Sequence, residues 1–128
     1  MRLFRTLPGL ALTLLVGASL VLFLAPLGDP GGPEDSDKVA HLGIFATLAL
    51  AGCWARLPVL RLGLGLAVYA ALVEVVQGTV TVLGRAGDVR DLAADLVGIG
   101  VGLAVAAVLG LVRGRSDAEE PSGISPRG

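Results

Sequence analysis

The sequence predicts an all-α fold, a polytopic membrane bundle of four transmembrane helices with both termini in the cytoplasm. Three observations support this prediction. Hydrophobic residues make up 54% of the 128 residues and charged residues only 16%, which is less charge than a soluble domain of this length carries. The apolar residues gather into four runs that are close to the length needed to span a bilayer. Basic residues concentrate on one side of these runs.

The four apolar runs account for the predicted helices in chain order. They cover residues 7–27, 39–55, 62–76 and 92–112. The first run follows a short basic start and could also open a secretory signal peptide, but its length favours a helix that is retained. The third run is short and can reach the far interface only if Glu74 and Gln77 belong to the helix. We therefore predict that this helix includes both polar residues.

Turn-forming residues separate the runs. Gly and Pro are concentrated at residues 28–33, a Leu57-Pro58 pair follows the second run, and two glycines frame residues 84–87. The last thirteen residues are polar and rich in Ser, Pro and Gly, a composition typical of disorder. We therefore predict a membrane domain over residues 1–115 and a disordered cytoplasmic tail over residues 116–128.

Basic residues set the predicted orientation. In a four-helix arrangement one side of the membrane receives Arg2, Arg5, Arg56, Arg61, Arg113 and Arg115. The other side receives Lys38, Arg85 and Arg90 among several acidic residues. Because short cytoplasmic loops carry an excess of Lys and Arg, the first side is predicted to be cytoplasmic.

Charge and cysteine content exclude two classes of function. The formal net charge is -1 and no Lys/Arg cluster stands on one face, so the chain has no electrostatic footprint for nucleic acid. Cys53 is the single cysteine, which rules out an internal disulfide framework and a cysteine-rich zinc site.

Three ionisable residues, His41, Glu74 and Asp95, each lie near the same end of a different apolar run. Placing an ionisable side chain in the hydrocarbon core of a bilayer costs free energy, so such residues usually mark a functional site. At a rise of about 1.5 Å per residue, each lies roughly 20 to 27 Å from the basic residue at the cytoplasmic end of its helix. We therefore expect all three at one depth, just beneath the extracytoplasmic headgroups.

Helical phase predicts that these groups also face one another. Positions three and four apart form one stripe along a helix, and each of the three residues extends such a stripe. The stripes of the third and fourth helices consist largely of small residues, which let helices approach closely, and Gly98-x-x-x-Gly102 has the spacing of such contacts. The three stripes are Asp37, His41, Phe45, Leu48 and Gly52; Gly63, Ala67, Ala70, Glu74 and Gln77; and Asp88, Asp91, Asp95, Gly98 and Gly102.

Three blocks of these residues resemble the VanZ-like family of small bacterial integral membrane proteins. The blocks are Asp37-Lys38-Val39-Ala40-His41 with Phe45; Glu74-x-x-Gln77; and Gly84-Arg85 followed by Asp88, Asp91, Ala94-Asp95, Gly98 and Gly102. The resemblance covers roughly residues 36–103. It implies a multi-pass protein of the bacterial plasma membrane, linked to the cell envelope and to resistance against the glycopeptide antibiotic teicoplanin. Relatives often carry Asn where this chain has Asp95.

The cluster suggests acid–base chemistry beside an anion-binding site. Glu74 below the interface suits general acid or base work, His41 is its natural proton partner, and Asp95 completes the predicted catalytic set. Guanidinium groups of Arg85 and Arg90 fit a phosphate or carboxylate. We expect an outward-facing site that binds or processes the headgroup of a membrane lipid or envelope precursor; whether it is an enzyme stays open, and no cofactor is identified. The other predicted binding residues are Asp37, Lys38, Gln77, Asp88 and Asp91.

Three alternatives stay open beside this expectation. In the first, the polar groups are purely structural, with Asp37 and Asp91 as helix caps, in a scaffold or a bundle that binds or excludes a glycopeptide. A small transporter would have to work as a homo-oligomer, because the inner halves of the helices are apolar. A metal site could use Asp37, His41 and the carboxylates of the fourth helix, but no H-x-x-x-H or H-E-x-x-H spacing is present, and we expect no metal.

Overall fold

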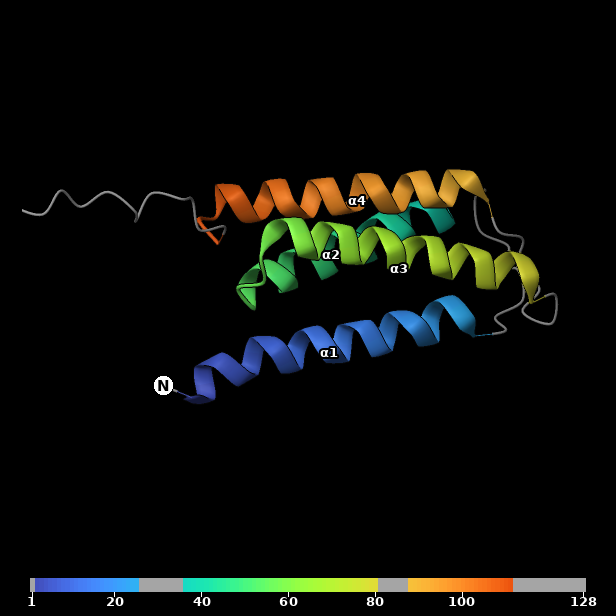
Figure 1. The fold of residues 1–128 in the computed structure, drawn as a ribbon. Helices are drawn as coiled ribbons and strands as arrows, with labels where there is room; N and C mark the ends of the chain where they lie inside the picture. Colours follow the sequence, from blue (N-terminus) through green and yellow to red (C-terminus); the bar gives the residue numbers. More distant parts are fainter. Residues whose placement is uncertain (1, 26–35, 81–87, 112–128) are drawn as a thin grey trace, which may run out of the picture.

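The computed structural model describes residues 2–25, 36–80 and 88–111, and over these residues the protein consists of four helices (Figure 1). They are α1 (Arg2–Leu24), α2 (Ser36–Trp54), α3 (Val59–Thr79) and α4 (Val89–Val108). Successive helices alternate in direction, so the C-terminal ends of α1 and α3 and the N-terminal ends of α2 and α4 meet at one end of the bundle. The predicted tail at residues 116–128 lies outside the described residues.

Three of these helices are long and apolar enough to cross a membrane: α1 over Thr6–Leu24, α3, and α4. The third extends through Glu74 and Gln77 to Thr79, which confirms the predicted extension of the short apolar run. The second helix, α2, has 19 residues but falls outside this set. Its first turns carry Asp37, Lys38 and His41, which lower its mean hydropathy.

The α2 helix is nevertheless the most enclosed of the described helices, because it has the most buried residues and packs most closely on α4. Two glycines of α4 make this approach possible. A Cβ atom on Gly98 would collide with the backbone carbonyl of Leu42, and one on Gly102 would collide with that of Ala46. The small-residue stripe predicted on the fourth helix is therefore a close helix–helix seam.

Aromatic rings and one hydrogen bond attach α1 to α2 and α3. Phe23 lies 5.9 Å from Phe45 and Phe45 lies 5.6 Å from Tyr69, measured between ring centroids. The Ser19 hydroxyl of α1 forms a 2.8 Å hydrogen bond with the Tyr69 hydroxyl of α3. These contacts lie in the C-terminal half of α1, toward the end of the bundle where the polar residues collect.

The opposite end of the bundle is closed by the short turn between α2 and α3. Arg56 has a positive φ of 61°, and the amide of Leu57 donates to the carbonyl of Gly52, a pattern that ends helices with one left-handed residue. Pro58 then sets the backbone angle from which α3 begins. Arg56 and Arg61 therefore lie at the end of the bundle away from His41.

Candidate functional site

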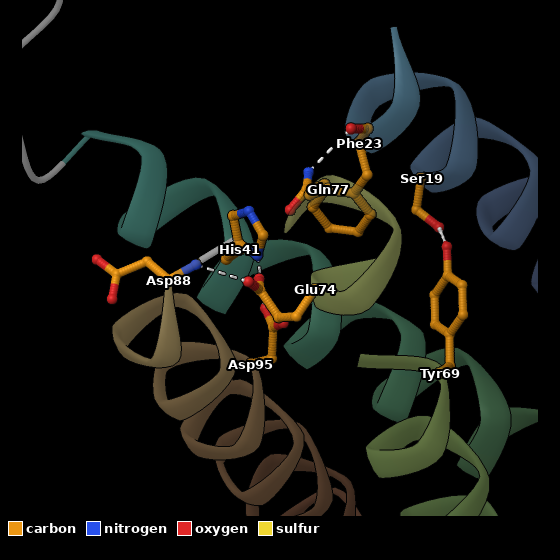
Figure 2. Close-up of polar contacts among 8 residues, drawn as sticks. All are labelled: Ser19, Phe23, His41, Tyr69, Glu74, Gln77, Asp88 and Asp95. Atoms are coloured by element: carbon orange, nitrogen blue, oxygen red, sulfur yellow. Dashed lines mark hydrogen bonds and ion pairs between the residues drawn. The ribbon is translucent and has the colours of Figure 1, made fainter. Parts of the chain in front are cut away.

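A buried pair of side chains, His41 and Asp95, forms the centre of the polar end. His41 lies in the second turn of α2 and Asp95 in the second turn of α4. The Nδ1 atom of His41 and the Oδ1 atom of Asp95 are 2.9 Å apart, and the two side chains are 1% and 0% exposed (Figure 2). The close seam between α2 and α4 sets this distance, because Gly98 lies three residues beyond Asp95 and fits against Leu42.

Glu74 reaches the pair from the last turns of α3. Its Oε2 atom accepts a 2.9 Å hydrogen bond from the backbone N–H of Asp88, the residue that precedes α4. One ligating atom each from His41, Glu74 and Asp95 lies within 4.8 Å of the others. We call these three residues the inner group. Their convergence is what helical phase and depth predict from the sequence.

Each member of the inner group carries one buried polar atom that has no hydrogen-bond partner among the described residues. These atoms are Nε2 of His41, Oε1 of Glu74 and Oδ2 of Asp95. Leaving a polar group unpaired in an apolar surrounding costs roughly 1 to 3 kcal/mol, and more when the group is charged. Three such atoms on one cluster indicate a site organised to receive a proton, an ion or a polar ligand.

A second group shares the same imidazole. Ligating atoms of Asp37, His41 and Asp91 also lie within 4.8 Å of one another, and we call these residues the outer group. Asp37 is exposed in the first turn of α2, and Asp91 is half-buried in the first turn of α4. His41 therefore links a fully enclosed carboxylate, Asp95, to carboxylates nearer the surface.

The structure assigns the cap of α4 to Asp88 rather than to Asp91. The Oδ1 atom of Asp88 accepts a 2.9 Å hydrogen bond from the backbone N–H of Arg90, and Asp88 is the N-cap residue. Its carboxylate points away from His41 and Asp95 in Figure 2. Asp91 lies in the first helical turn, where its charge favours the helix N-terminus and its side chain reaches the outer group.

Gln77 ties α3 to α1 at the same end of the bundle. Its Nε2 atom donates a 2.9 Å hydrogen bond to the carbonyl oxygen of Phe23 (Figure 2). Phe23 is the second-last residue of α1, so its carbonyl has no partner within the helix. The Phe23 ring lies 4.6 Å from the His41 ring, centroid to centroid, and covers the imidazole from the α1 side.

The basic residues of the predicted binding set are only partly described. Arg90 is exposed and makes no ion pair with Glu74 within the described helices. Lys38 is half-buried in the first turn of α2. Arg85 lies outside the described residues. The described part of the site is therefore dominated by carboxylates around one imidazole.

Sequence reasoning did not find the contribution of α1. Phe23, Ser19 and the helix-end carbonyl that Gln77 caps were not predicted, because α1 has no ionisable residue in its apolar run. The available signal was the spacing of Ser19 and Phe23, which are four residues apart and so share one face of a helix.

The geometry of the inner group suits proton transfer. A carboxylate that accepts from Nδ1–H of a histidine orients the ring and leaves Nε2 as the nitrogen that exchanges protons. Glu74 supplies a second group able to give or accept a proton nearby. Comparison of the chain with protein-family models, curated proteins and solved structures gives no match, so the chemistry of the site is argued from these contacts.

Proposed function

We propose that this chain is a VanZ-like protein of the bacterial plasma membrane whose four helices all cross the bilayer, with both termini in the cytoplasm. Three helices have the required length and hydropathy, and α2 contacts each of them, which supports a spanning α2 as well. Arg56 and Arg61 lie at the end opposite His41, and their charge favours a cytoplasmic position for that end. The polar end then faces the outside of the cell.

We further propose that the polar end binds or processes the headgroup of an envelope lipid or lipid-linked precursor. The observation that carries this proposal is the set of three buried, unpaired atoms of His41, Glu74 and Asp95 at one end of an apolar bundle. In this role His41 exchanges a proton through Nε2, Asp95 orients the ring, and Glu74 acts as the second acid or base.

An apolar groove beside the site supports a lipid as the ligand. It has a volume of about 410 Å³ and runs between α1 and α2. Leu22 and Ala40 line it, and Ala40 directly precedes His41. An acyl chain lying in this groove would place its headgroup at the depth of the inner group.

The test is mass spectrometry of lipids and envelope precursors that copurify with the full chain in mild detergent. The ligand is expected to fall at least about tenfold in Glu74→Gln and His41→Ala, because each removes a group that contacts the headgroup. Thr79→Val is the matched control, since among the described residues the Thr79 hydroxyl bonds only carbonyls of its own helix at the same end of the bundle. Unchanged lipid content in both site variants would refute the proposal.

A structural role is the second candidate, favoured by the tight seam between α2 and α4. In a scaffold or a bundle that excludes a glycopeptide, the polar groups would only hold the helices together. Teicoplanin susceptibility of cells that express the variants separates the two. Loss of protection in Gly102→Leu with full protection in Glu74→Gln favours the scaffold, whereas loss in Glu74→Gln at normal protein level favours the headgroup site.

A further inference from the structure

We propose that the outer group, Asp37, His41 and Asp91, binds one divalent transition-metal ion, with Nε2 of His41 as the nitrogen ligand. This inference rests on the polar site proposed above and names a cofactor for it; with the ion on Nε2, that nitrogen is a ligand and proton exchange at the site falls to Glu74. Two independent observations carry it. One is the cluster of three ligating side chains within 4.8 Å, and the other is the buried and unpaired Nε2 atom of an imidazole that belongs to the cluster.

The contact between His41 and Asp95 leaves Nε2 as the nitrogen for an ion. Nδ1 of His41 is 2.9 Å from Oδ1 of Asp95, so this ring nitrogen carries the proton that the carboxylate accepts. In the neutral ring Nε2 then presents a lone pair. Histidines that bind metals almost always donate their other ring N–H to a carboxylate, carbonyl or water, which orients the ring and makes the ligating nitrogen more basic. Asp95 fills this supporting position.

The two oxygen ligands come from the first turns of neighbouring helices. Asp37 precedes His41 by one turn on α2, and Asp91 precedes Asp95 by one turn on α4. The seam at Gly98 holds these two helices in register, so that the acidic first turns lie beside each other. An imidazole with two carboxylates is a donor set for Zn²⁺, Mn²⁺ or Fe²⁺, whereas Mg²⁺ and Ca²⁺ prefer oxygen alone.

Exposure decides between the outer and the inner group. Asp95, the carboxylate of the inner group that contacts His41, is fully buried. Asp37 is exposed and Asp91 half-buried, which leaves a path by which a hydrated ion can reach the site. The positive charge of the ion would also offset the carboxylates that crowd the imidazole, and it would offer an anionic headgroup a partner at the mouth of the site.

The proposal is tested by measuring metal content of the purified full chain in detergent, with any affinity tag removed and without added lipid. The protein is dialysed against Zn²⁺, and separately against Mn²⁺, and bound metal is measured by mass spectrometry against protein concentration. Wild type is expected to hold one ion per chain. His41→Gln and Asp91→Asn are expected to bind at least about tenfold more weakly, and Asp95→Asn about 10- to 100-fold more weakly.

Asp88→Asn is the matched control for Asp91→Asn. It removes the same charge from the same end of α4, Asn caps helices as well as Asp does, and the Asp88 carboxylate points away from His41. This variant is expected to retain the ion. Circular dichroism shows which variants fold, and Asp91→Asn, a substitution of equal size at a half-buried position, keeps the test valid if His41→Gln does not fold.

The outcomes also separate this inference from the proposed headgroup site. Glu74→Gln is expected to keep the ion while it loses the copurifying lipid. A wild-type chain that binds no ion, or equal binding in wild type, His41→Gln and Asp91→Asn, would overturn the metal site and leave the lipid result standing. Loss of the ion in Glu74→Gln with retention in Asp91→Asn would likewise overturn it, because the ion would then belong to the inner group.

Discussion

Replacing Gly98 with alanine tests the idea that the α2–α4 seam sets the geometry of the site. A Cβ atom at this position would come closer to the carbonyl oxygen of Leu42 than real Cβ atoms do, and it would lie unusually close to the Cα and carbonyl carbon of Leu42, at 3.0 Å and 3.1 Å. Backbone atoms cannot rotate away as a flexible side chain can. The helices must therefore move apart, and overpacking of this kind costs about 1 to 3 kcal/mol.

Gly100 provides the matched comparison two residues further along α4. A Cβ atom there would meet no described atom within 4 Å, so Gly100→Ala adds only helix propensity, a gain of up to about 1 kcal/mol. Both alanine variants gain this helix propensity, so they should differ in the free energy of unfolding by the overpacking cost alone, about 1 to 3 kcal/mol, with Gly98→Ala the less stable.

The assay is reversible unfolding of the purified chain in mixed detergent micelles, followed by circular dichroism. Gly98→Ala should also weaken metal or lipid binding, because separating α2 from α4 lengthens the 2.9 Å contact between His41 and Asp95. Equal stability of the two variants would show that the helices do not approach as closely as described, and the account of how the seam positions the site would fail.

Two further predictions concern the attachment of α1. Gln77→Leu removes the hydrogen bond to the Phe23 carbonyl, while the leucine side chain fills the space of the glutamine. This variant should lower the free energy of unfolding by about 1 kcal/mol in the same unfolding experiment. An unchanged free energy of unfolding would mean that the Phe23 carbonyl finds another donor. Ser19→Ala and Tyr69→Phe, combined in a double-mutant cycle, should show a coupling of about 0.6 kcal/mol, the average for hydrogen bonds between membrane helices. A coupling of zero would argue that the 2.8 Å contact does not hold α1 in place.

The sequence predicts the helices and the convergence of the inner group because both follow from periodicity. Apolar runs mark the helices, and the spacing of three and four residues puts His41, Glu74 and Asp95 on inward stripes at a common depth. The helix boundaries are less well predicted from the apolar runs. Polar residues at a helix end still form the helical backbone hydrogen bonds, although they lie outside the apolar run. The fourth helix accordingly begins at Val89 rather than near residue 92.

The hydrogen-bond partners at the site could not be predicted from the sequence, because they depend on how the helices pack against one another and not on the periodicity of any single helix. The sequence could not show that Glu74 accepts from the amide of Asp88, or that Gln77 caps the end of α1. It also placed the capping function on Asp91, because an acidic residue in the first turn of a helix favours the terminus whether or not its side chain is the cap. Asp88 bonds the free N–H instead.

The enclosed position of α2 has a consequence for how the protein is made. Three helices are long and apolar enough to cross a membrane, whereas α2 carries Asp37, Lys38 and His41 and has a lower mean hydropathy. Insertion of α2 into the membrane should therefore depend on its neighbours. We expect α2 and α3, which are joined by a short turn, to leave the translocation channel together as a helical hairpin. Nascent chains truncated before Val59 should then leave α2 outside the bilayer, where proteases can reach it.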